Sequence, residues 1–198
     1  MLGSIEYWHP RWKEKARLAE SIAELSGRST YGPLGQYLLI GDAAYGLDIH
    51  REDDLLDIGC AAGFTGRFFA ENLACYVGVD YNKGALERFG HKQLVHASAT
   101  NLPFPDKSFS KSYMGSVLLC MSKDECQLAL NEMRRVTKVR GYIADTLLQQ
   151  GPEKNVTFFA LTEFVSMLNV AGFSRVETRP MNPCLPHASI AIDTIVWP

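Results

Sequence analysis

Short apolar runs alternate with amphipathic stretches along most of this 198-residue chain. Apolar runs of about four to eight residues favour buried strands, whereas apolar positions three and four apart favour helices that cover them. The pattern predicts strands near residues 54–59, 75–80, 93–98, 109–116, 141–148, 175–180 and 189–197, and helices near 64–72, 82–90, 123–137 and 160–171. This alternation predicts an α/β fold built on a sheet.

Glycines and prolines mark the ends of these elements. Gly90, Gly141 and Gly172 lie just after predicted helices or just before strands, where glycine adopts a left-handed cap at little cost. The loop between the last two predicted strands contains Pro183 and Pro186 and is too short to hold a crossover helix. We therefore expect these two strands to pair antiparallel.

The first 50 residues differ in texture from the remainder of the chain. They are helical and aromatic and show no strand pattern. No linker or repeat separates them from the residues after position 50. We therefore expect residues 1–50 to form a helical N-terminal cap on a single domain that spans residues 51–198.

Composition narrows the class of protein. A hydrophobic content of 46% and a charged content of 21% are ordinary for a soluble globular chain. We expect neither a transmembrane span nor a secretory signal, and a formal charge of -2 gives no general attraction to nucleic acid. Five cysteines without metal-ligand spacing indicate no metal site and a reduced, cytoplasmic location.

One basic run has two interpretations, an RNA-binding surface or a solvated helix face. Arg11, Lys13, Lys15 and Arg17 have helical spacing, but Glu14 and Glu20 balance them. A solvated helix face is therefore the better interpretation.

The strongest chemical signal is the turn that comes after the first predicted strand. The apolar run breaks into small residues at Gly59, Ala61 and Gly63 and then starts a helix, and Asp80 ends the next apolar run. Such a turn lets backbone N–H groups approach a ligand, and an acid about 20 residues later can bind a ribose. A dinucleotide turn needs a small residue where Phe64 stands, so a nicotinamide cofactor fits this spacing less well.

This turn resembles the first motif of the class I S-adenosylmethionine-dependent methyltransferases. Three later segments resemble the family's subsequent motifs in the same order: Val77–Asn82, Ala97–Phe109 and Asn131–Tyr142. The resemblance covers roughly residues 50 to 198 and is closest to the small-molecule branch typified by ubiquinone biosynthesis. It implies a doubly wound, mostly parallel seven-stranded sheet of the Rossmann-like kind, with an antiparallel last strand, and S-adenosyl-L-methionine as the cofactor.

The resemblance also assigns roles to the motif residues. It places the small residues of the first turn against the methionine end of the cofactor and Asp57 near the ammonium group. Asp80 would accept hydrogen bonds from the ribose hydroxyls, Tyr81 would lie against the adenine, and Ser98 would face the adenine amino group. The expected cofactor-binding residues are Asp57, Gly59, Cys60, Ala61, Gly63, Asp80, Tyr81, Ser98, Ala99, Thr100 and Gly115.

Several positions depart from the family pattern. Ala61 replaces the middle glycine of the turn, which the backbone tolerates if φ is negative there. Ser98 and Ser110 stand where aspartates are usual, and Leu118–Met121 carries no histidine. These departures keep open a second interpretation, a non-catalytic cofactor-binding or regulatory protein with the same fold.

The acceptor is described only in general terms. The resemblance implies methyl transfer to a small or medium organic molecule, with no nucleic acid or membrane partner, and leaves open whether the chain pairs with a second copy. No general base is located by the sequence. The candidate lining groups are Tyr7, His9, Tyr31, Tyr45, Cys120 and His187. For each of them a packed helix or loop residue is the simpler interpretation.

Overall fold

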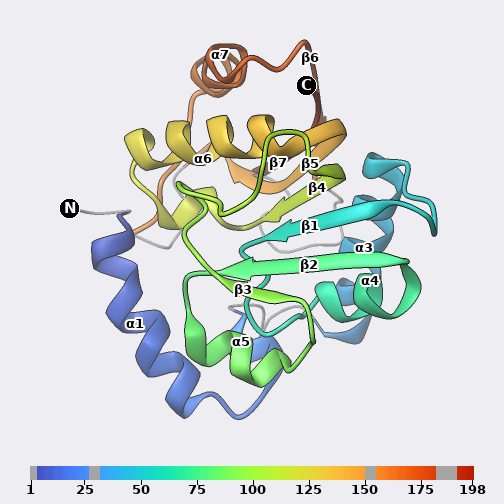
Figure 1. The fold of residues 1–198 in the computed structure, drawn as a ribbon. Coiled ribbons are helices and arrows are strands. Elements are labelled where there is room, and N and C mark those ends of the chain that lie inside the picture. Colours follow the sequence, from blue (N-terminus) through green and yellow to red (C-terminus); the bar gives the residue numbers. More distant parts are fainter. Residues whose placement is uncertain (1–3, 27–31, 150–154, 182–190) are drawn as a thin grey trace.

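A single sheet organises the protein, whose computed structural model describes residues 4–26, 32–149, 155–181 and 191–198. Its strands are β1 (Asp54–Ile58), β2 (Cys75–Asp80), β3 (Leu94–His96), β4 (Phe109–Gly115), β5 (Thr137–Leu147), β6 (Arg175–Pro180) and β7 (Ala191–Trp197). They lie in the order β3-β2-β1-β4-β5-β7-β6, and β7 runs opposite to the other six described strands, pairing antiparallel with both β5 and β6 (Figure 1). The predicted seven-stranded sheet with an antiparallel last strand is confirmed.

Successive strand residues face opposite sides of the sheet and so build two apolar layers. Leu55 and Tyr113 belong to one buried cluster, while their neighbours Leu56 and Met114 belong to the other. The helices α6 (Lys123–Val136) and α7 (Leu161–Ala171) cover the second layer. The helices α3 (Pro33–Leu47), α4 (Gly66–Asn72) and α5 (Lys83–Phe89) cover the first (Figure 1). None of the helices in the described ranges combines the length and apolarity needed to cross a bilayer.

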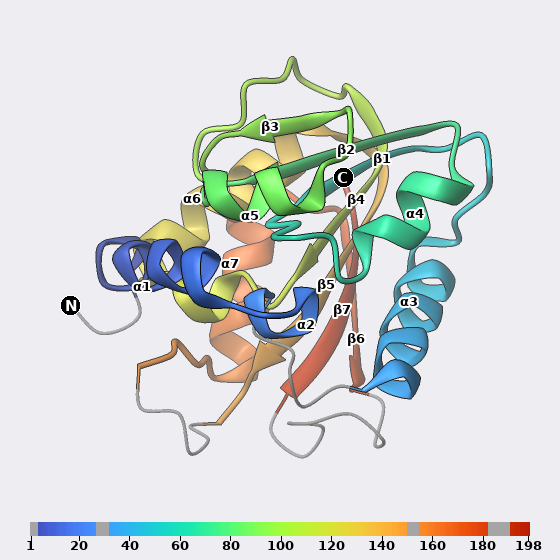
Figure 2. The same ribbon diagram turned by 90° about the horizontal axis from the view of Figure 1, so that it is seen from below.

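The first two helices take a different position from α3. The helix α1 (Ile5–Leu18) and the single turn α2 (Ile22–Leu25) lie beside the carboxyl ends of β1 and β2 (Figures 1 and 2). Ser4 caps α1 by accepting a hydrogen bond from the Tyr7 N–H. The Asn82 side chain donates to the Trp12 carbonyl at 2.8 Å, which fastens α1 next to the start of α5.

Two of the three predicted glycine stops are confirmed. Gly90 and Gly172 end α5 and α7 with φ of 67° and 89°. The expectation for Gly141 is wrong, because β5 begins directly after α6 and Gly141 lies inside the strand. A Cβ at Gly141 would lie 2.7 Å from the Met133 methyl, so this glycine allows α6 to pack closely on the sheet.

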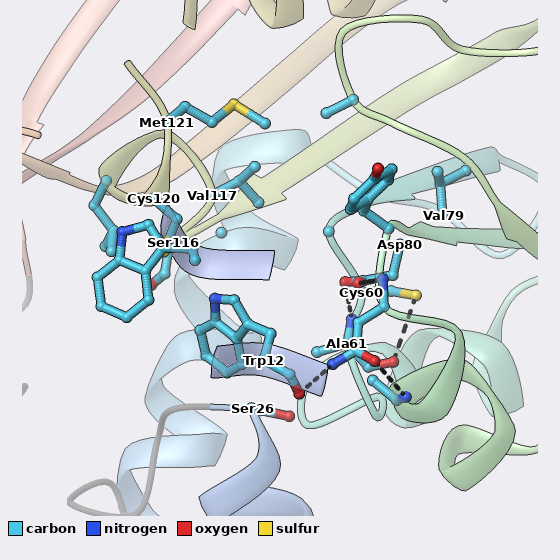
Figure 3. A pocket seen from close by; sticks show the side chains of 18 of the residues that line it. Trp12, Ser26, Cys60, Ala61, Val79, Asp80, Ser116, Val117, Cys120 and Met121 are labelled. Carbon is cyan, nitrogen blue, oxygen red and sulfur yellow. Dashed lines mark hydrogen bonds between the residues drawn. The ribbon is translucent and has the colours of Figure 1, made fainter. Parts of the chain in front are cut away.

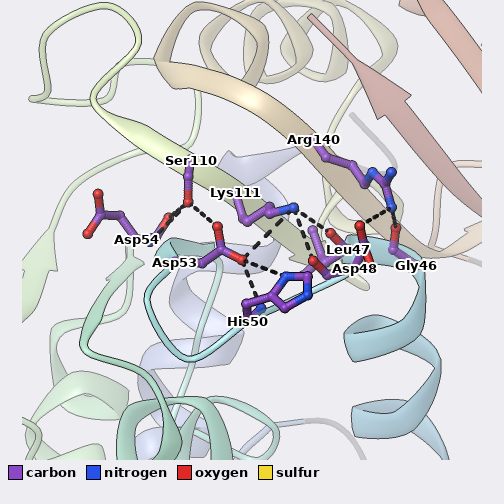
Figure 4. A network of polar contacts seen from close by, with 9 residues as sticks. All are labelled: Gly46, Leu47, Asp48, His50, Asp53, Asp54, Ser110, Lys111 and Arg140. Carbon is purple, nitrogen blue, oxygen red and sulfur yellow. Dashed lines mark hydrogen bonds and ion pairs between the residues drawn. The ribbon is translucent and has the colours of Figure 1, made fainter.

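A polar network ties the end of α3 to the amino-terminal edge of the sheet (Figure 4). The buried Lys111 donates to the carbonyls of Leu47 and Asp48 at 2.9 and 3.2 Å, and its Nζ lies 3.9 Å from the Asp53 carboxylate. Ser110 donates to the same carboxylate at 2.8 Å. Burial lowers the pKa of Lys111, against the opposing effect of Asp53. Ser110 stands near the start of β4, where the family pattern described above usually has an aspartate. Here the serine binds the carboxylate of Asp53.

Candidate active site

A cavity of about 590 Å³ lies at the carboxyl ends of β1, β2 and β4 (Figure 3). The strand order reverses between β1 and β4, and ligands of open α/β sheets bind at such a switch point. The volume lies within the roughly 300–1,000 Å³ that ligand sites usually have. Backbone and side chains of the turn after β1 form one wall, and α1 covers the cavity from the opposite side.

Only glycine fits at two positions of the turn after β1. Gly59 has φ of 78°, and a Cβ there would come within 2.2 Å of a Val117 methyl. Gly63 has φ of 76°, and a Cβ there would come within 2.5 Å of the Phe89 ring. The Gly59 N–H donates to the Val79 carbonyl at 2.7 Å, which draws the turn against the end of β2. These glycines therefore permit both the turn and its close packing.

Ala61 also adopts a left-handed conformation, with φ of 47°. We expect an alanine to be tolerated here if its φ is negative. The φ of Ala61 is positive, so this condition is not met. Contact between Cβ and the next carbonyl makes this conformation cost about 1–2 kcal/mol for a non-glycine residue. The Ala61 N–H donates to the Asp80 carboxylate at 2.8 Å, and this bond holds the strained turn in place.

Asp80 organises the junction between the first two strands. One carboxylate oxygen accepts from the Ala61 N–H, and the other accepts from the Asn82 N–H at 2.7 Å. Burial raises the pKa of Asp80, while these two hydrogen bonds act to lower it. A carboxylate has about four acceptor positions. The Tyr81 backbone also acts to lower the pKa of Asp80 by a hydrogen bond. Because Asp80 lines the cavity, we expect the remaining acceptor capacity to serve a ligand hydroxyl.

Asp57 is the second acid of the cavity wall. It is buried in β1 and accepts a hydrogen bond from the Tyr76 hydroxyl at 2.7 Å. Burial, together with the nearby Asp57 charge, raises the pKa of Tyr76 well above its ordinary value. The tyrosine therefore acts as a donor that fixes the orientation of the Asp57 carboxylate.

The aromatic ring of Tyr81 contacts a residue of α1. The rings of Tyr81 and His9 lie 4.6 Å apart, and His96 approaches the same ring at 6.0 Å. Nearby, the hydroxyls of Ser98 and Thr100 are 2.8 Å apart. Ser98 lines the cavity, whereas Thr100 lies outside the lining and is hydrogen-bonded to Ser98.

The structure brings most of the expected cofactor residues together. Those that line the cavity are Asp57, Gly59, Cys60, Ala61, Asp80, Tyr81, Ser98, Ala99 and Gly115. Gly63 and Thr100 are not part of the lining; Gly63 packs against Phe89, and Thr100 bonds to Ser98.

Of the six further candidate lining groups, two line the cavity, two lie elsewhere and two fall outside the described residues. His9 and Cys120 line the cavity. Tyr7 lies outside the lining and accepts a hydrogen bond from the Asn155 side chain. Tyr45 is 77% exposed on α3, away from the cavity. Tyr31 and His187 lie outside the described residues.

Sequence reasoning missed the aromatic wall that α1 supplies. Trp8 and Trp12 line the cavity, and the Trp12 indole projects from α1 into the space between the turn at Ala61 and the loop at Ser116 (Figure 3). The spacing of Ile5, Trp8 and Trp12 is an apolar stripe at helical period. This stripe is readable in the sequence, but it does not reveal what the helix faces.

The basic run on α1 is mostly exposed. Arg11, Lys13 and Arg17 are exposed to solvent, and Arg17 pairs with Glu14 at 2.7 Å. Arg11 and the half-buried Lys15 also belong to the lining of the cavity. The predicted solvated face therefore describes three of the four positions, two of which lie away from the cavity.

Comparison with known families identifies the central part of the chain. A family model described as "Methyltransferase domain" matches residues 56–144, which run from β1 into β5. No curated protein sequence matches the chain.

Solved structures share the fold over nearly the whole chain. Phosphoethanolamine N-methyltransferase 1 of Haemonchus contortus, in complex with phosphoethanolamine and S-adenosylhomocysteine, has a TM-score of 0.76 and 11% identity. That match covers 97% of this chain and 48% of the other, so this chain spans about half the length of that enzyme.

Two further structures match most of their own length. The [4+2]-cyclase SpnF has a TM-score of 0.66 and 16% identity, covering 98% of this chain and 92% of its own. A putative methyltransferase of Haloferax volcanii, solved in complex with a methyltransferase activator, has a TM-score of 0.72 and 14% identity, covering 94% and 96%. At these identities the likeness shows a common fold.

Proposed function

We propose that this protein, which belongs to the class I S-adenosylmethionine-dependent methyltransferases, transfers the cofactor's methyl group to a small or medium organic acceptor held under α1. One observation carries the proposal. A single cavity joins an acid-bearing wall at the ends of β1 and β2 to an apolar wall supplied by α1 and the loop after β4. A cofactor and an acceptor can therefore meet in the same enclosed space.

The acidic wall suits the cofactor's charge. S-adenosylmethionine carries a cationic sulfonium and an ammonium group, and it supplies an electrophilic methyl group when bound. We expect Asp80 to accept hydrogen bonds from its ribose, using the acceptor positions that Ala61 and Asn82 leave. We expect Asp57, held by Tyr76, to lie near the ammonium end. A buried Asp57 carboxylate near the ammonium group makes a favourable electrostatic pairing.

The chain's main contribution to the reaction is alignment and exclusion of water. Methyl transfer is an in-line displacement, so holding the acceptor in the right direction supplies much of the rate enhancement. Trp12, Leu119 and Met121 provide apolar walls that displace water from the reacting groups. His9 is the lining histidine in the described part of the chain, and we expect it to take a proton if the acceptor releases one.

Direct binding and transfer measurements test this proposal. Calorimetry with S-adenosylmethionine, S-adenosylhomocysteine and NAD should show binding of the first two only. Incubation with methyl-tritiated cofactor and a panel of amine, phenol and carboxylate acceptors should then give transfer. Binding of NAD together with no binding of either sulfur compound would refute the proposal.

A second function is favoured by one structural neighbour and by the turn itself. The fold is also that of the [4+2]-cyclase SpnF, so the fold alone does not dictate methyl transfer. Ala61 brings a methyl group and backbone strain into the turn. Tight S-adenosylmethionine binding with no transfer to any acceptor of the panel would favour a non-catalytic cofactor-binding protein.

A further inference from the structure

Charge is unevenly distributed around the cavity. Its lining acids, Asp57 and Asp80, lie on the wall formed by β1 and β2 and already bind donors of the protein. Its lining bases, Arg11 and Lys15, both come from α1. Within the described lining, the α1 side thus contributes positive charge and the strand side contributes negative charge.

The α1 side of the cavity also supplies two large aromatic residues. Trp8 and Trp12 lie on the same helix, and Leu119 and Met121 come from the loop after β4. Aromatic rings and apolar side chains make a wall on which a planar apolar body can pack. These apolar walls by themselves do not select the charge of the ligand.

Arg11 introduces a preference for a negatively charged ligand. Its guanidinium carbon lies 3.6 Å from the centre of the Tyr7 ring, and one Nη donates to the Tyr7 carbonyl at 2.7 Å. No salt bridge joins it to a carboxylate among the described residues. A guanidinium has five N–H donors in a fork that matches a carboxylate or phosphate, so Arg11 keeps donors for an anion.

We infer that the acceptor of this site is a planar, apolar molecule that carries an anionic group, with Arg11 as the residue that binds the anion. Lys15, whose Nζ lies 4.7 Å from the centre of the Trp12 ring, adds positive charge on the same side. This inference rests on the proposed function and adds the substrate class. Arg11 and Lys15 are the two positions of the basic run that line the cavity, and Arg11 is also exposed to solvent, where a ligand enters.

A matched pair of probes tests the inference without knowledge of the true acceptor. Naphthalene-2-carboxylate and naphthalene-2-carboxamide share the same rings and differ in charge. Calorimetric titration of the protein saturated with S-adenosylhomocysteine should give at least tenfold tighter binding of the carboxylate. In Arg11→Gln the preference should fall to about twofold, because the carboxylate loses affinity and the carboxamide does not.

Arg17→Gln is the matched control, since Arg17 lies on the outer face of the same helix and pairs with Glu14. It should keep the full preference for the carboxylate. Equal binding of both probes, no binding of either, or an undiminished preference in Arg11→Gln would each overturn the inference.

The titration with S-adenosylhomocysteine is made first and is read separately. If the protein fails to bind it, the proposed function fails, and the two naphthalene probes are then titrated into the protein alone. A preference for the carboxylate there, abolished in Arg11→Gln, still supports the anion-binding role.

Discussion

Replacing Ala61 with glycine should stabilise the protein. Ala61 has φ of 47°, a left-handed conformation that costs an alanine about 1–2 kcal/mol. Glycine removes this cost, but it gains about 0.5–1 kcal/mol of conformational freedom in the unfolded chain. The difference spans about 0–1.5 kcal/mol, and its central part is a net gain of roughly 0.5–1 kcal/mol. For a chain of 198 residues this corresponds to a rise in Tm of about 1–4 °C.

The neighbouring alanine provides the control. Ala62 is fully buried and does not have a positive φ, so it lacks the strain of Ala61. Ala62→Gly should destabilise the protein by about 1 kcal/mol, through entropy and the loss of a buried methyl group. Urea unfolding of the two variants and of the parent protein, monitored by circular dichroism, measures both effects. Equal destabilisation by the two substitutions would refute the assignment of strain to residue 61.

Three further results are expected. Asp80→Ala should weaken S-adenosylhomocysteine binding about ten- to hundredfold in calorimetry, roughly 1.5–3 kcal/mol, and unchanged affinity in the folded variant would show that the ribose is bound elsewhere. Lys111→Met should lower the unfolding free energy in urea by about 2–4 kcal/mol, because it leaves α3 carbonyls and Asp53 without their cation; a loss below about 0.5 kcal/mol would contradict the network. The hydrogen bond from Arg135 lowers the pKa of Glu132 below its ordinary 4.5, so this stabilisation is present above pH 4.5 and is lost as the pH falls through the folded-state pKa. Between pH 7 and pH 3 the urea midpoint should fall further in the parent protein than in Glu132→Gln, and equal falls would show that the pair does not contribute.

Much of the sheet was predictable because its signals are local. The run from Asp54 to Ile58 holds three aliphatic residues and is followed by small residues, which predicts a buried strand and then a turn. Gly90 and Gly172 end helices as predicted, since only a left-handed residue closes them cheaply. The prediction for Gly141 is wrong because glycine is also needed where a helix packs tightly on a strand, as α6 does on β5.

The α1 wall was less predictable because its position depends on distant partners. Trp12 shows helical spacing in the sequence, but nothing local indicates which side of the sheet its helix approaches. That position depends on the bond from Asn82, which is 70 residues away. The backbone conformation of Ala61 also could not be predicted from local sequence. The carboxylate of Asp80, in another strand, helps to hold it.

The contacts that hold α1 also set an order of events during synthesis. The Trp8 indole N–H donates to the Asn155 carbonyl at 3.0 Å, across 147 residues of sequence. The Ile5 N–H donates to the Glu125 carboxylate, across 120 residues. These α1 residues leave the ribosome well before their partners, so they must wait for residues that emerge later, and such long-range contacts form slowly. The nascent chain therefore completes its turns and first strands before α1 can close over the cavity, and this wall of the cavity is fixed only after Asn155 has been translated.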